Sequence, residues 1–283
     1  MARPMWFVKI IRHYFPNRFA IAETTKKSVI MRKLIDYLLF EKDEIYYLPK
    51  EDVFLDQTNE KRRVLVDQNI DLGEETALPS EIVRHFIEEA NNIWLMDKCI
   101  CRESNDCKDY PIDIGCIFLG DAVLGINPKL GRLATKQEAL DRLQKAIDLG
   151  LVHMIGRNKI DTQWMGIGPG EKLLSICHCC PCCCLYRVLP SLDETISSRI
   201  TKIPGLQIYV IEEECIGCGI CANDICVTNS IQIVNEKAVI DNLCLGCGRC
   251  VEVCPTDAIV MEITDEHFID TTIKRISQRV DVK

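Results

Sequence analysis

Eighteen cysteines are the side chains of this 283-residue sequence with the clearest capacity for chemistry. They fall into three blocks, and none lies before Cys99 or after Cys254. Thiols at close spacing can form disulfides, bind zinc or hold iron–sulfur clusters. The spacing inside each block helps to separate these three kinds of chemistry.

The third block is an internal repeat of a four-cysteine motif. Each half has three cysteines with two residues between consecutive members, followed by a fourth: Cys215, Cys218, Cys221 and Cys226, then Cys244, Cys247, Cys250 and Cys254. Three thiolates at this spacing wrap around one cubane, and the fourth ligand comes from the other half. Zinc is the alternative, but zinc ribbons use paired knuckles of two cysteines rather than triplets.

Residues 206–264 resemble the bacterial-type ferredoxin domain that holds two [4Fe–4S] clusters. The resemblance implies two ligand sets: Cys215, Cys218, Cys221 and Cys254 for one cluster, and Cys244, Cys247, Cys250 and Cys226 for the other. The first half departs from the pattern by one extra residue before Cys226, and Val227 stands where the second half has Pro255. The insertion widens a loop and removes no ligand.

The first block has four cysteines within 18 residues: Cys99, Cys101, Cys107 and Cys116. The residues between them, such as Arg102, Asp106 and Lys108, are polar and typical of a loop. Thiols in such a stretch would be exposed to oxidation unless metal held them. Four thiolates suit a cubane, and a four-cysteine zinc site is the alternative.

The second block has six cysteines within eight residues: Cys177, Cys179, Cys180, Cys182, Cys183 and Cys184. Neighbouring residues of an extended chain point to opposite sides, so these thiols serve more than one site or leave some as redox groups. His178 could ligate iron or donate a hydrogen bond to a cluster sulfur. The ten cysteines outside the ferredoxin-type part predict two further cubanes with ligands shared between blocks, or one unusual larger cluster.

These two blocks lie in a wider frame, residues 75–265, that resembles a family of multi-cluster 4Fe-4S binding proteins of anaerobic archaea and bacteria. The resemblance is carried by Cys99-Ile-Cys-Arg-Glu-Ser, by Gly115-Cys-Ile-Phe-Leu-Gly120 and by the run from Ile176 to Cys184. It implies iron–sulfur binding and an anaerobic setting. It carries no established reaction.

Helical segments separate the cysteine blocks. Thr135 and Glu138 form a capping box ahead of a stripe that includes Leu143. Pro79 and Ser80 open a helix whose apolar face is expected to reach Trp94, and a third stripe follows Ser28 as Ile30, Leu34, Leu38 and Leu39. We expect all three stripes to pack in a core.

The predicted fold class is α+β, with a mostly helical Cys-rich N-terminal and middle region followed by the ferredoxin-like domain. The expected domains are a docking or scaffold region at 1–75, an iron–sulfur domain at 76–205, the ferredoxin-type domain at 206–264 and a tail at 265–283. Trp6, Phe7, Ile10 and their basic neighbours suit an amphipathic helix on a partner, on a membrane surface or on the protein's own core.

Charge and hydropathy limit the kinds of partner and compartment that we expect for this protein. The sequence has 34 lysines and arginines against 42 aspartates and glutamates, a net charge of −8, which argues against a nucleic-acid partner. No apolar run reaches the roughly 18 residues of a membrane span, and residues 1–20 lack the apolar segment of a signal peptide. We therefore expect a cytoplasmic protein with reduced thiols.

These features predict a protein that relays electrons through several [4Fe–4S] clusters between a low-potential carrier and a partner oxidoreductase. The alternatives are a redox enzyme in which a middle cluster or the thiols of Cys177–Cys184 act on a substrate, and a scaffold that handles clusters or metal. Hydrolase motifs and the glycine-rich dinucleotide motif are absent from the sequence, so we predict no catalytic residue of those kinds and no bound dinucleotide.

Overall fold

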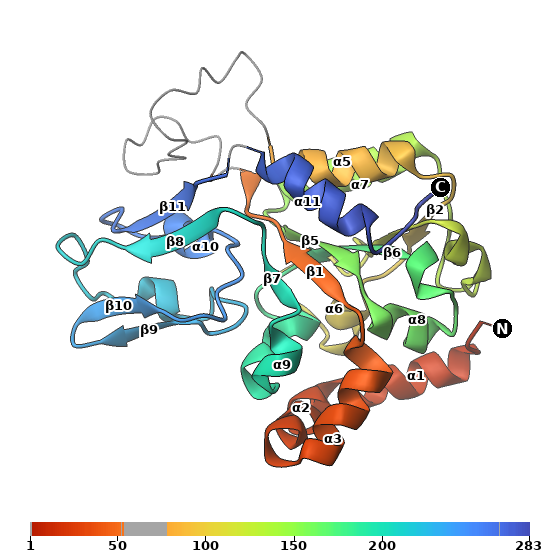
Figure 1. Ribbon diagram of the computed structural model, residues 1–283, viewed down its shortest axis with the longest axis horizontal. Coiled ribbons are helices and arrows are strands. Elements are labelled where there is room, and N and C mark those ends of the chain that lie inside the picture. Colours follow the sequence, from red (N-terminus) through yellow and green to blue (C-terminus); the bar gives the residue numbers. More distant parts are fainter. Residues whose placement is uncertain (1, 52, 54–77, 266) are drawn as a thin grey trace.

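The computed structural model describes residues 2–51, 53, 78–265 and 267–283. In Figure 1 a large sheet flanked by helices forms one part of the molecule, and two small sheets form the other. Helices and strands alternate along the chain, which confirms the α+β class at this coarse level. Of the predicted region 1–75, residues 1, 52 and 54–75 lie outside the described residues.

The large sheet has seven strands in the order β4-β2-β3-β6-β5-β1-β7. Its strands are β1 (Glu44–Tyr47), β2 (Ile93–Met96), β3 (Ile117–Leu119), β4 (Gly131–Leu133), β5 (Val152–Arg157), β6 (Leu174–Cys179) and β7 (Ile200–Lys202). Neighbouring strands are antiparallel except for β1 and β7, which run parallel. The central pair β5 and β6 places Val152 opposite Cys179 and Met154 opposite Cys177.

This sheet runs through the region where the sequence pattern predicted mainly helices. The reason is visible in β2 and β3, which are short and buried at every position. A strand buried on both faces reads as a continuous apolar run, without the alternation that identifies a half-buried strand.

The helices of the middle region agree better with the sequence. They are α5 (Ser80–Glu89), α6 (Ile100–Ser104), α7 (Lys136–Asp148), α8 (Lys159–Met165) and α9 (Glu194–Ser197). The capping box of Thr135 and Glu138 is present at the start of α7. The helix predicted to reach Trp94 instead ends at Glu89, because Asn91 and Asn92, which favour turns, separate it from β2.

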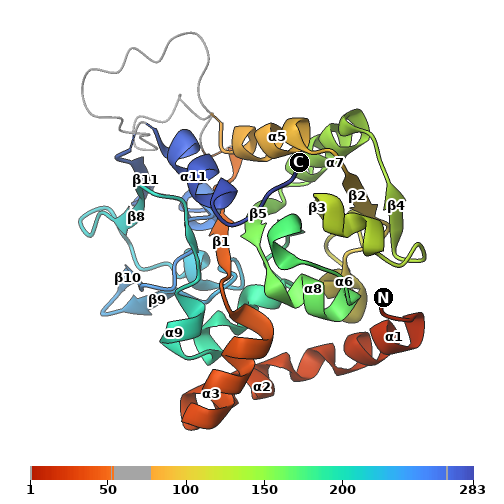
Figure 2. The same cartoon turned by 45° about the vertical axis from the view of Figure 1, so that its right-hand side comes forward.

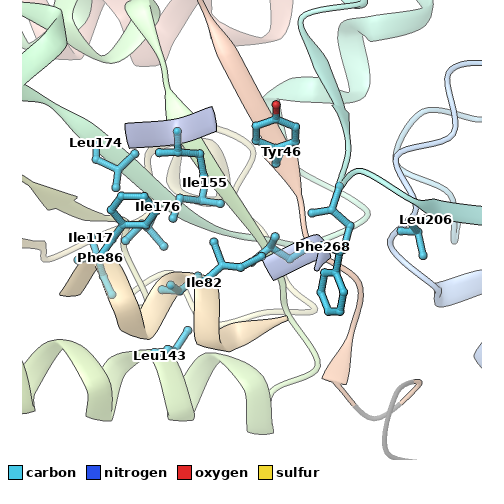
Figure 3. Close-up of a cluster of buried hydrophobic side chains, with 14 of the residues drawn as sticks. Tyr46, Ile82, Phe86, Ile117, Leu143, Ile155, Leu174, Ile176, Leu206 and Phe268 are labelled. Carbon is cyan, nitrogen blue, oxygen red and sulfur yellow. The ribbon is translucent and has the colours of Figure 1, made fainter. Parts of the chain in front are cut away.

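The main core lies between the sheet and helices α5 and α7. In Figure 3, Ile82 and Phe86 of α5 and Leu143 of α7 lie beside Ile117, Ile155, Leu174 and Ile176 of the strands. The same cluster continues to Leu206 and to Phe268 in α11 (Phe268–Ser277). The predicted domains at 76–205 and 206–264 therefore share one core.

The ferredoxin-type part repeats one arrangement twice. The first half is β8 (Leu206–Val210), η6 (Ile220–Ala222) and β9 (Ile231–Val234), and the second is β10 (Lys237–Ile240), α10 (Arg249–Glu252) and β11 (Ile259–Ile263). The outer strands β8 and β11 pair with each other, and β9 pairs with β10, all antiparallel. Each small sheet therefore joins strands of both halves.

The N-terminal helices are α1 (Met5–Tyr14), α2 (Arg18–Lys27) and α3 (Val29–Ile35), followed by the helical turn η2 (Asp36–Phe40). Figure 2 shows α1 running along the side of the molecule that carries α6 and α8. Ser28 caps α3 as predicted. The expected core stripe is wrong here, because Ile30, Leu34 and Leu38 are exposed, Ile30 by 79%. No helix among the described residues is long and apolar enough to cross a membrane.

Leu143→Ala tests the shared core. Leu143 is fully buried between α7 and the sheet, so truncation should lower the free energy of unfolding by about 2–5 kcal/mol. The control is Leu133→Ala, since Leu133 is 51% exposed and should change stability by less than about 0.5 kcal/mol. Denaturation of anaerobically prepared protein would measure both, and equal effects would refute this assignment of the core.

Candidate metal centres

The second cysteine block begins inside β6 and continues through a turn into η5 (Leu185–Ser191). Alternation along β6 directs Cys177 and Cys179 to one face and His178 to the other. The His178 ring pairs there with His153 of β5, with 3.0 Å between the two Nδ1 atoms. Burial lowers the pKa of both rings, that of His153 to about 4, so the pair is neutral at pH 7. His178 thus has a protein partner on the face opposite the thiols of β6.

Four thiols from two blocks form the first group, which we call the four-thiol site. Its members are Cys107, Cys180, Cys182 and Cys183, whose Sγ atoms lie within 4.8 Å of one another. Ile114, Leu151 and Ala146 surround the group with apolar side chains. Four thiols are the number that one cubane or one zinc ion takes.

The other six thiols of these blocks surround a second place, which we call the six-thiol cavity. They form three close pairs: Cys99 with Cys101, Cys116 with Cys177, and Cys179 with Cys184. The Sγ atoms of Cys116 and Cys177 are 3.3 Å apart. All six line one cavity of about 210 Å³, and Cys180 of the four-thiol site lines it as well. The prediction that the first two blocks share sites therefore agrees with the structure.

The thiols of this cavity influence one another strongly. The hydrogen bond from Cys101 lowers the pKa of Cys99 to about 6, and the hydrogen bond with Cys179 lowers that of Cys184. Their partners shift in the opposite direction, since bonding to the thiolate and burial raise the pKa of Cys101 and Cys179. One thiol of each of these two pairs, Cys99 and Cys184, is therefore predisposed to the thiolate form that binds metal.

Tyr47 at the end of β1 joins this cavity to the ferredoxin-type part. Its hydroxyl oxygen lies 3.0 Å from Cys184 Sγ and 3.6 Å from Cys179 Sγ. The same residue lines a small cavity, about 20 Å³, that is bordered by Cys226, Cys244, Cys247 and Cys250. Three residues further along the chain, the backbone N–H of Lys50 donates to the carbonyl of Cys247 at 3.1 Å. Strand β1 and the residues after it thus contact both sets of thiols.

The eight cysteines of the repeat fall into two groups. One group borders the small cavity and takes Cys226 from the first half with Cys244, Cys247 and Cys250 from the second. In the other group, Cys221 interacts electrostatically with Cys218, Cys254 and Cys215. Each group contains one cysteine from the opposite half, which is the exchange that the ferredoxin resemblance implies. Cys218 is the one exposed member.

Buried arginines beside the thiols fit anionic clusters. Arg102 is fully buried and donates to the carbonyls of His178 and Ile114. Burial opposes its charge, but nearby Cys99 and Cys180 more than compensate, so the pKa of Arg102 is raised. Its Nε–H has no partner among the described residues, and neither has that of Arg249, which lines the small cavity. Cluster sulfides would be acceptors for such N–H groups.

Comparison with known families supports this chemistry for the C-terminal part. A family model for the LdpA Fe-S cluster-binding domain matches residues 222–264, which include five of the repeat's eight cysteines. The match supports an iron–sulfur-binding protein. No curated protein and no solved structure matches the chain. The four-thiol site and the six-thiol cavity both lie outside the matched residues.

Sequence reasoning missed the roles of Tyr47, Arg102 and Arg249. Tyr47 lies 137 residues from Cys184, and Arg249 lies 70 residues from the carbonyl of Cys179 to which it donates. No local motif marks a tyrosine or an arginine that reaches a distant cluster. A signal for Arg102 existed in its position directly after Cys101, but polar neighbours made that segment read as an exposed loop.

Arg102→Gln tests whether the charge of this arginine stabilises the four-thiol site and the six-thiol cavity, which together are the middle sites. The substitution removes a buried positive charge and hydrogen bonds to two carbonyls, which should destabilise the fold by about 3 kcal/mol. We expect iron to be lost from the middle sites while the ferredoxin-type EPR signals remain. The control is Arg132→Gln, whose side chain is 56% exposed. Full iron content in the Arg102 variant would contradict this role.

Proposed function

We propose that the chain relays electrons through several iron–sulfur clusters between a low-potential carrier and a partner oxidoreductase. The observation that supports this relay is that the thiol groups lie next to one another in series. Cys250 interacts electrostatically with Cys221, which connects the two groups of the repeat. Tyr47 connects the second group to the six-thiol cavity. Electron transfer requires close neighbouring centres, and this order supplies them.

The four-thiol site adjoins the six-thiol cavity in the same way. Cys180 of the four-thiol site directly follows Cys179 and lines the six-thiol cavity as well. Cys180 also interacts electrostatically with Cys184. We therefore propose iron–sulfur clusters at both places, with the four-thiol site as a terminus of the relay.

The other terminus is the group that contains Cys218. This cysteine is exposed, and Ile216 and Ile220 beside it are 65% and 44% exposed. Exposed apolar side chains around a redox centre suit a transient protein contact. We propose that the soluble carrier docks here and that electrons enter or leave through this cluster.

A redox enzyme is the second candidate. It is favoured by the volume of the six-thiol cavity, about 210 Å³, and by the apolar side chains of Ile11, Phe15 and Leu39 in its wall. A substrate beside an iron with an open position would occupy such a space. Cyanide that changes the EPR spectrum of this centre would favour the enzyme, and an unchanged spectrum would favour the relay.

Cys218→Ala tests whether electrons enter through the exposed group of the repeat. Loss of one ligand should remove the exposed cluster and leave the middle clusters loaded. Reduction of the middle clusters by a reduced two-[4Fe–4S] ferredoxin, followed by freeze-quench EPR, should then slow at least tenfold. Val239→Ala, at a 49% exposed position of β10, is the matched control. An unchanged rate in the cysteine variant would place the entry point elsewhere.

Tyr47→Phe tests the contact between the two parts. Removing a hydrogen bond to thiolate sulfur should lower the reduction potential of the centre in the six-thiol cavity. A loss of about 1.4 kcal/mol corresponds to about 59 mV for one electron. Tyr46→Phe is the control, because the Tyr46 hydroxyl bonds to Glu44 instead. Equal potentials for both variants in an EPR-monitored titration would refute the role of Tyr47.

A further inference from the structure

With Cys180 counted in the four-thiol site, the six-thiol cavity still contains two thiols more than a single cubane can use, since a cubane takes four. The six come from four places in the fold. Cys99 and Cys101 lie at the start of α6, Cys116 precedes β3, Cys177 and Cys179 lie in β6, and Cys184 precedes η5. All of them line the same cavity.

The three close pairs also interact with one another, so a single cubane would not leave one pair isolated from the rest. Cys101 interacts with Cys99, Cys184 and Cys116, so it connects all three close pairs. Cys179 interacts with both Cys184 and Cys116 in the same way. Whichever four thiols held a cubane, the remaining two would lie beside it.

The six-thiol cavity is also larger than the neighbouring cavity in the ferredoxin-type part. The cavity bordered by the second group of the repeat measures about 20 Å³, against about 210 Å³ for the six-thiol cavity. Ile11, Phe15 and Leu39 of the N-terminal helices form part of the wall. These helices therefore shield the thiols from water, which explains why α1 packs against α6 and α8.

Positive charge is concentrated around the same thiols. Arg102 lies next to Cys99 and Cys116, and Arg18 interacts with Cys101 and Cys184. The Arg18 guanidinium is held over the Phe15 ring, 4.3 Å from its centroid. Two cations beside six thiolates suit a centre that carries more negative charge than one cubane.

We propose that the six-thiol cavity binds an eight-iron centre made of two cubanes joined by one sulfide. Every iron then has its fourth ligand. Six of the eight irons each bind one thiolate, and the remaining two share the bridging sulfide. This inference rests on the proposed iron–sulfur relay, and it makes the six-thiol cavity a single centre able to hold more than one electron between the ferredoxin-type clusters and the four-thiol site.

Iron and sulfide analysis of the whole chain, purified without air, tests the proposal first. Three cubanes and one eight-iron centre predict about 20 iron atoms per chain. A value near 16 would overturn the eight-iron centre and leave the relay of four cubanes intact. A value near 8, with only the ferredoxin-type signals in EPR, would overturn both the proposal and the relay.

Single Cys→Ser variants at each of the six positions test the eight-iron centre independently of the total iron content. An eight-iron centre needs every thiol, so all six variants should lose the Mössbauer signal of that centre and at least four iron atoms. One cubane with two unused thiols would leave two variants with full iron and would refute the proposal. Cys107→Ser, in the four-thiol site, is the matched control and should lose about four iron atoms while keeping that signal. The ferredoxin-type EPR signal reports that each variant has folded.

Discussion

Ligation of iron by thiolate is the interaction on which we propose that the arrangement of this protein depends. The chain brings ten of its cysteines, which are separated by up to 85 residues, to two adjoining places beside one end of β6. Burying so many thiolates together is unfavourable unless a positive centre holds them. In the proposed arrangement iron supplies that charge, and Arg102 and Arg18 add to it. Metal binding and folding would then be coupled in the middle region.

The large sheet gives these ligands a rigid base. Cys177 and Cys179 belong to its central strand, Tyr47 belongs to β1, and the core of α5 and α7 fills its other face. The same core continues into β8 and β11, so the ferredoxin-type part cannot turn away from the middle region without exposing apolar surface. This rigidity would keep the proposed clusters at fixed separations, as a relay requires.

The sequence predicted the chemistry better than the architecture. Cysteine spacing is local, so it identified the repeat, and the structure brings thiols of the first two blocks together. The caps at Ser28 and Thr135 are local too, and both are present. The seven-stranded sheet, the exposure of Ile30 and the reach of Tyr47 to Cys184 all depend on which segments pack together, and no pattern within one segment encodes that.

The central claim is that iron occupies all the thiol groups, in series from the exposed Cys218 to the four-thiol site. Anomalous X-ray scattering at the iron edge, from crystals grown without air, tests it most directly. The account predicts iron peaks at both groups of the repeat, in the six-thiol cavity and at the four-thiol site. Iron confined to the repeat, or peaks at the zinc edge in the middle region, would contradict it.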